Sequence, residues 1–127
     1  MSIRDRDRWV SALRTPAQWR AASSRLLLEI PTAERTASVL ARLEVEGGMR
    51  SDERRPVASL FGVLRLLPVT DQVARRAGEY LRMYRRSHGG IDLVDYVIAA
   101  TAELHGARLA TLHIKHFPMF PDLAPPY

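Results

Sequence analysis

Two aspartates open an otherwise apolar segment, GIDLVDYVIAATAELHG at residues 90–106. Asp92 and Asp95 stand three residues apart at the start of a pattern with helical periodicity. On that helix Asp95 lies at the edge of the apolar face, stacked with Ala99 and Ala102, whose small side chains leave room for an ion and water. The structural alternative is that Asp92 caps the helix and Asp95 interacts only with its dipole. The segment alone leaves both interpretations open.

A second acidic group follows a predicted strand, TASVLA at residues 36–41. Glu44 in ARLEVEGG is expected to start a short helix at the carboxyl end of this strand, and Glu46 is a rival that points to a different side. The structural alternative is a solvent-facing glutamate in a first helical turn. Two carboxylates from separate strand–helix connections can hold Mg²⁺, which takes one or two of them besides water and phosphate. Such an ion activates water against a phosphodiester.

Other reaction chemistries find little support in the sequence. It contains no cysteine, no P-loop, no G-x-G-x-x-G and no G-x-S-x-G. His113 and His116 stand three residues apart in TLHIKHF, but a zinc site needs a further ligand near by. These two histidines are therefore interpreted as polar residues at the end of a strand.

Composition and charge fit a cytoplasmic protein of one domain. The chain has 127 residues, 46% of them hydrophobic and 26% charged, and no apolar run that predicts a transmembrane helix. Its net charge is +5, and Lys115 is the single lysine beside the arginines. This arginine excess is typical of GC-rich codon usage, and it also suits a phosphate-rich partner. Five arginines share one predicted helix: Arg75, Arg76, Arg82, Arg85 and Arg86.

Helices alternate with short apolar strands from residue 36 onward, which predicts an α/β fold with a parallel sheet flanked by helices. In such sheets, sites form beyond the carboxyl ends of the strands. The predicted strands are residues 36–41, 64–69 and 107–114, and the clearest helices are 71–88, capped by Thr70, and 92–105. Residues 1–30 show no clear strand, and TPAQWRAASSRLLLEI, residues 15–30, predicts a helix.

Four segments in this order resemble the PIN-domain ribonucleases of the VapC toxin type: TASVLARLEVEGG, LLPVTDQVARRAGEYLR, DLVDYVIAATAELHGARLATL and KHFPMF. The resemblance covers roughly residues 33–127, and its most specific part is the D-x-x-I-A-A-T-A run that begins at Asp95. It implies an endoribonuclease that depends on Mg²⁺ or Mn²⁺ and cuts RNA, often tRNA or rRNA. It also implies a cognate VapB-like antitoxin as partner, and a homodimer.

The resemblance carries over to individual residues. The helix-borne glutamate of the family falls on Glu44 and its mid-chain aspartate on Asp95, which makes both predicted metal ligands and, with His113, the predicted catalytic residues. Under the same resemblance Arg42 orients Glu44 or contacts phosphate, and Thr111 lies near the phosphodiester. The remaining predicted RNA-binding residues follow the RNA backbone: Arg75, Arg82 and Arg86.

Two departures from the family pattern stand out. The family opens with a strand that ends in D-(T/S)-(S/N), which residues 1–32 lack, since Asp5 and Asp7 sit in a charge run. The late motif T-x-(N/D)-x-x-(D/H)-F has His113 where Asn or Asp is usual. We therefore expect an atypical helical N-terminal segment, 1–32, whose first strand is missing or replaced, and an incomplete PIN-like domain, 33–127.

Two other functional interpretations follow from these departures. One is a catalytically impaired PIN-like protein that binds antitoxin or RNA without cleaving it. The other is a basic α/β binding module whose carboxylates are only helix caps.

Overall fold

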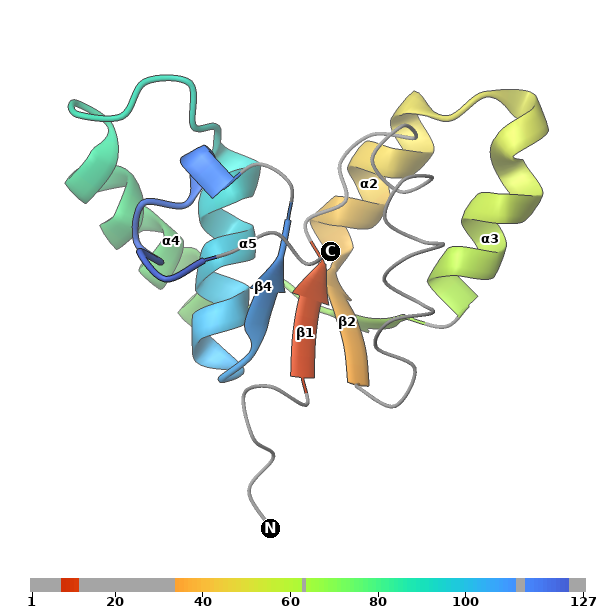
Figure 1. Cartoon of the computed structure of the whole chain (residues 1–127), viewed down its shortest axis with the longest axis horizontal. Coiled ribbons are helices and arrows are strands. Elements are labelled where there is room, and N and C mark those ends of the chain that lie inside the picture. Colours follow the sequence, from red (N-terminus) through yellow and green to blue (C-terminus); the bar gives the residue numbers. More distant parts are fainter. Residues whose placement is uncertain (1–7, 12–33, 63, 112–113, 124–127) are drawn as a thin grey trace, which may run out of the picture.

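A parallel sheet runs through the centre of the protein. The computed structural model describes residues 8–11, 34–62, 64–111 and 114–123. Within these ranges neighbouring strands are parallel, and Val10 lies opposite both Thr36 and Leu109. The strands, in the order β3-β2-β1-β4 across the sheet, are β1 (Arg8–Ser11), β2 (Glu34–Ser38), β3 (Arg65–Leu67) and β4 (Arg108–Ala110). Figure 1 shows β1, β2 and β4 ending at one edge of the sheet, called the carboxyl edge below.

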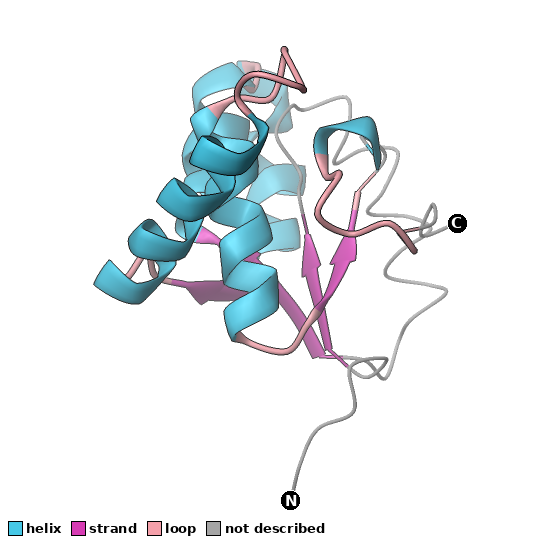
Figure 2. Ribbon diagram, turned by 90° about the vertical axis from the view of Figure 1, so that its left-hand side faces the viewer, coloured by secondary structure: helices cyan, strands magenta, loops and turns pink. Residues whose placement is uncertain are grey.

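Helices follow the strands on either side of β1 in Figure 1, α4 and α5 beside β4, α2 and α3 beyond β2. The described helices are α2 (Val39–Gly48), α3 (Arg54–Gly62), α4 (Asp71–Tyr84) and α5 (Leu93–Leu104), with short 3₁₀ turns η2 (Ser51–Glu53) and η3 (Ile114–His116). Figure 2, viewed from the α4 side, shows α4 and α5 running side by side. The predicted parallel α/β fold is thereby confirmed.

Side-chain caps set where the helices begin. The Thr70 hydroxyl accepts a hydrogen bond from the backbone N–H of Val73 at 3.2 Å, which confirms the predicted start of α4. The Ser38 hydroxyl accepts one from the N–H of Leu40 at 3.2 Å. This second cap starts α2 at Val39, so the strand predicted at 36–41 ends earlier and Glu44 lies in the second turn of α2.

Two apolar clusters fill the space around the sheet. One joins α4, α5 and β4 and includes the buried aromatic side chains Tyr80, Tyr96 and Phe117. The other joins α2, α3 and β2, with Val45, Val57 and Phe61 among its buried members. The apolar faces predicted from helical spacing thus pack against the sheet and against each other. None of the described helices has the length and the apolar character that crossing a membrane requires.

The strand β1 corrects the prediction for the N-terminal segment. No strand was expected in residues 1–30, yet Arg8–Ser11 pairs with β2 on one side and β4 on the other. The four residues RWVS are too short and too close to a charge run for periodicity to reveal them, and the ladders on both sides define them instead. A first strand is therefore present, and the version of the hypothesis in which it is missing is wrong. The helix predicted at residues 15–30 lies outside the described residues.

Tyr96 provides a test of the packing around α5. Its side chain is 1% exposed, and its hydroxyl has no hydrogen-bond partner among the described residues. Burial first, then the Asp95 carboxylate, then Tyr84 raise the pKa of the Tyr96 phenol. The fold therefore favours the neutral phenol, so this stabilisation is complete below pH ~10 and is lost as the pH rises through the raised pKa.

We expect Tyr96→Phe to leave the free energy of unfolding at pH 7 unchanged or to raise it by up to ~1 kcal/mol, because it removes a buried hydroxyl that lacks a partner. Between pH 8 and pH ~10.5 the variant should lose less stability than the wild type. Urea unfolding at pH 7, pH 8 and pH ~10.5 measures these differences. Tyr84→Phe, at a half-buried position, is the control. A clear loss of stability at pH 7 would contradict the packing described here.

Candidate functional site

The Asp95 carboxylate is buried in the first turn of α5, at the carboxyl edge of the sheet. Its side chain is 1% exposed. Asp92 precedes the helix, and its Oδ1 accepts a hydrogen bond from the backbone N–H of Asp95 at 3.1 Å. In return, Asp95 Oδ2 accepts one from the backbone N–H of Asp92 at 3.3 Å. Asp92 is thus the predicted cap, and Asp95 completes a reciprocal capping box near the positive end of the helix dipole.

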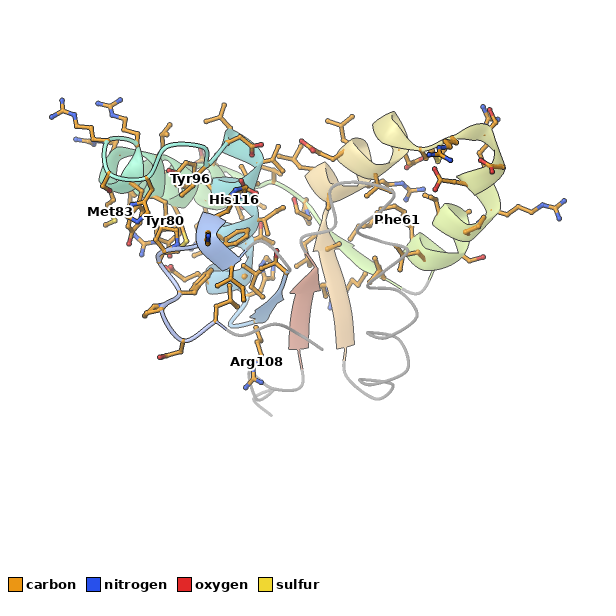
Figure 3. The ribbon with its side chains drawn as sticks, turned by 45° about the horizontal axis from the view of Figure 1, so that its top comes forward. Phe61, Tyr80, Met83, Tyr96, Arg108 and His116 are labelled. Carbon is orange, nitrogen blue, oxygen red and sulfur yellow. The ribbon has the colours of Figure 1, made fainter. Side chains whose placement is uncertain are left out.

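His116 approaches the same carboxylate from another element. Its Nδ1 lies 3.2 Å from Asp95 Oδ2, while its side chain is 32% exposed. The next residue, Phe117, is 1% exposed and anchors η3 in the core. Figure 3 shows His116 on η3 in front of α5, at the end that carries Tyr96. His116 was not predicted as a site residue; the signal in the sequence was its place before a buried aromatic residue in TLHIKHF.

The alanines next to Asp95 along α5 belong to the core. Ala99 and Ala102 are both 0% exposed and pack in the cluster shared with α4 and β4. The space for an ion and water that was expected beside them is therefore closed. Small side chains at these positions let neighbouring elements approach α5 closely instead.

Glu44 lies half-buried in α2, a helix that contacts α5. Its rival Glu46 is exposed and accepts a hydrogen bond from Arg42 Nε to Oε2 at 2.5 Å. The Arg42 guanidinium also lies over the Phe61 ring, 5.2 Å from its centroid. Arg42 is thus held by Glu46, at the favourable i,i+4 spacing, and by Phe61. That it orients Glu44 stays a prediction.

The described residues bring only part of the predicted site together. Asp95 and His116 touch, whereas no group of three or more His, Asp or Glu side chains suited to a metal ion occurs among them. Thr111 follows β4 directly and is 4% exposed, and His113 lies outside the described residues. The donor chemistry of Asp95 and Glu44 suits Mg²⁺, which needs one or two protein carboxylates. The residues present therefore fit a magnesium ion that takes its other ligands from water and substrate.

Exposed arginines cover the outer face of α4. Arg75, Arg82 and Arg86 are exposed, and their contact with a partner stays a prediction. Arg76 differs, since its guanidinium binds Glu79 at 2.7 Å and Glu103 at 2.8 Å and lies 4.3 Å from the centroid of the Tyr80 ring. It links α4 to α5 rather than facing a partner.

Comparison with known proteins agrees with this fold. The PIN domain family matches residues 6–113. The chain is 52% identical over 90 residues to ribonuclease VapC10 of Mycobacterium tuberculosis, covering 71% of this chain and 68% of that protein. It is 48% identical over 94 residues to ribonuclease VapC19 of the same species, covering 74% and 75%.

A solved structure has a similar fold. A chain of a toxin–antitoxin complex from Klebsiella pneumoniae superposes with a TM-score of 0.65 at 25% sequence identity, over 82% of this chain and 83% of that one. The protein therefore belongs to the PIN-domain family. Within that family it is of the VapC toxin type, as the sequence resemblance indicated.

The family match begins at residue 6 and so includes β1. This strand carries no aspartate between Arg8 and Ser11, so the sequence pattern of the family's first strand is replaced there. The division of the chain into residues 1–32 and 33–127 stays a prediction, because most of the first segment lies outside the described residues.

The capping box predicts how Asp92 affects stability. Asp92→Ala removes the side-chain acceptor for the N–H of Asp95, and we expect the free energy of unfolding to fall by about 1 kcal/mol. Asp92→Ser retains a capping oxygen and should recover most of this loss. Urea unfolding of the three proteins measures the difference. Equal stabilities of the alanine and serine variants would show that the cap contributes nothing.

Proposed function

We propose that this protein is a metal-dependent endoribonuclease of the VapC type, in which Asp95 and Glu44 bind Mg²⁺ or Mn²⁺. One observation carries the proposal: the Asp95 carboxylate is 1% exposed and fixed at a helix start on the carboxyl edge of a parallel sheet. Membership of the PIN-domain family and the ribonuclease names of its relatives support it. Carboxylate and water ligands suit either of the two ions.

Each residue has a distinct part in this mechanism. A bound divalent ion polarises the phosphodiester and lowers the pKa of a water molecule. Asp95, held by its capping box and by His116, offers a carboxylate whose position does not depend on a flexible rotamer. Glu44 supplies a second carboxylate from α2. Thr111, which directly follows β4, and His113 are proposed to act near the phosphodiester, and Arg42 is proposed to contact phosphate.

Partners follow from the same family membership. We propose that the substrate is RNA, either tRNA or rRNA, and that a VapB-like antitoxin inhibits the enzyme. We also propose that the protein forms a homodimer in the cytoplasm. The structural neighbour in a toxin–antitoxin complex supports the antitoxin. Arg75 and Arg82 on α4, with Arg86 in the turn after it, would follow the RNA backbone, because guanidinium groups bind phosphate oxygens in pairs.

A second candidate function is binding of antitoxin or RNA without cleavage. The small number of metal-binding side chains favours it, since no group of three such side chains occurs in the described ranges. Each carboxylate that is absent weakens the hold on Mg²⁺, because both charge and geometry are lost.

Cleavage of total RNA by the purified protein separates the two functions. With Mg²⁺ or Mn²⁺ we expect cleavage that EDTA abolishes. Asp95→Asn and Glu44→Gln should each reduce the rate on the order of 100-fold, because a ligand charge is lost without a change of shape. Glu46→Gln is the matched control, since Glu46 pairs with Arg42, and it should stay within about twofold of the wild type.

The outcomes distinguish the alternatives clearly. Cleavage that persists in EDTA or in Asp95→Asn would refute the metal mechanism. A folded wild type that binds RNA but leaves it intact with either ion would establish the non-cleaving function.

The arginines of α4 predict a salt-dependent affinity for RNA. The double variant Arg82→Ala and Arg86→Ala should bind RNA more weakly and reduce the slope of log Kd against log salt by about 2, one for each lost phosphate contact. Binding is measured by fluorescence anisotropy in EDTA between low and physiological salt. Arg54→Ala with Arg55→Ala on α3 removes the same charge from another exposed helix and should change the slope less. Equal slopes for both double variants would assign the effect to net charge alone.

A further inference from the structure

Three rings form a row along one face of α4 and the turn that follows it. Tyr80, Tyr84 and His88 are spaced four residues apart, which places them on the same side of a helix. The Tyr80 and Tyr84 ring centroids lie 6.4 Å apart, and the Tyr84 and His88 centroids 5.4 Å apart at an interplanar angle of 80°. Exposure rises along the row, from Tyr80 at 3% through a half-buried Tyr84 to an exposed His88. The row therefore leads from the core to the surface.

The outer ring is held in place although it is exposed. The Ser87 hydroxyl lies 2.8 Å from His88 Nδ1, and Tyr84 contacts the ring in a T-shaped arrangement. The backbone N–H of His88 donates to the carbonyl oxygen of Tyr84 at 2.8 Å, which continues the helical turn. A T-shaped pair joins one ring edge to one ring face, so ring faces of the pair remain available to a further aromatic group. A fixed ring loses little freedom when a ligand stacks on it.

The row ends in the connection that leads to the helix of the candidate catalytic carboxylate. His88 precedes Asp92 by four residues, and Asp92 caps the start of α5. Burial raises the pKa of the Tyr96 phenol, and Asp95 and Tyr84 raise it further, so the carboxylate and the middle ring of the row both influence one buried side chain of α5.

Positive charge surrounds the ring. Arg82, Arg85 and Arg86 are exposed on the last turn of α4 and just after it. The ion pairs of the described residues involve Arg76 on this helix but none of these three. Exposed guanidinium groups beside an exposed ring match the alternation of phosphate and base in a single strand.

We propose that His88, supported by Tyr84, is a stacking platform for one unpaired base of single-stranded RNA, with Arg85 and Arg86 on the adjoining phosphates. This inference rests on the proposed ribonuclease function and adds to it a preference for unpaired nucleotides. Stacking uses the π-face that every base has, so the platform tolerates any base sequence. A duplex would not engage it, because its bases already stack on each other.

The test compares ring and charge at one position. Fluorescence anisotropy in EDTA measures the affinity of the full-length protein for a labelled single-stranded oligouridylate, and inorganic polyphosphate serves as a competitor without bases. His88→Leu should weaken RNA binding about five- to tenfold, whereas His88→Phe, which keeps a ring, should stay within about twofold of the wild type. Polyphosphate should compete equally well against all three proteins. Met83→Ala, which removes another exposed side chain of α4, is the control and should not change either affinity.

Each outcome decides a different point. Equal losses in the leucine and phenylalanine variants, or a parallel loss of polyphosphate binding, would overturn the platform, because a charge or the fold would then carry the effect. An unchanged leucine variant would overturn the platform alone and leave the ribonuclease proposal standing. A wild type that neither binds nor cleaves RNA would overturn the proposed function, and the platform with it. Thermal unfolding of every variant shows that the fold is retained.

Discussion

The burial of one carboxylate constrains the rest of this structure. A charged group that is 1% exposed costs several kcal/mol unless donors replace the lost water. The backbone N–H of Asp92 donates to Asp95 Oδ2, and Asp95 lies at the positive end of the α5 dipole. His116 Nδ1 lies 3.2 Å from the same oxygen and forms an ion pair with it when the imidazole is protonated. The capping box and the anchored turn η3 are therefore features of the fold that also stabilise the buried charge of Asp95. A metal ion would add a further compensating charge.

The helix that carries Asp95 is placed with little freedom. Tyr96 and the residues from Ile98 to Ala102 are buried, and α5 contacts α4, β1, β2 and β4. A helix buried on most of its surface holds the side chains of its first turn more precisely than a loop does. The parallel strands add the second condition, since they bring the start of α5 and the helix after β2 to one edge. The two helix starts thus owe their common edge to topology.

Local signals predicted the parts of the fold that depend on neighbours in sequence. The Thr70 and Asp92 caps and the helical spacing after them are such signals, and both starts were found. β1 was not predicted, because its four residues beside a charge run are defined by ladders with β2 and β4, which are distant in sequence. His116 was not predicted as a site residue for the same reason, since only the folded chain brings it to Asp95. Glu44 was singled out by its place after a predicted strand and again by the family resemblance, and its role as a metal ligand stays a prediction. The partner of Arg42 followed from helix geometry that the sequence already contained.

The link between α4 and α5 relates the proposed RNA-binding arginines to the carboxylate. Arg76 binds both carboxylate oxygens of Glu103, at 2.8 and 3.2 Å, and this hydrogen bonding, followed by that to Glu79, raises the pKa of its guanidinium. The pair is partly exposed, however, and such pairs contribute only about 0–1 kcal/mol. The stronger constraint is the core beneath it, where Val73, Ala77 and Tyr80 of α4 share a cluster with α5. The exposed arginines therefore sit on a helix whose distance from Asp95 is fixed by close packing, so a strand bound along α4 would be presented to the carboxylate in one register.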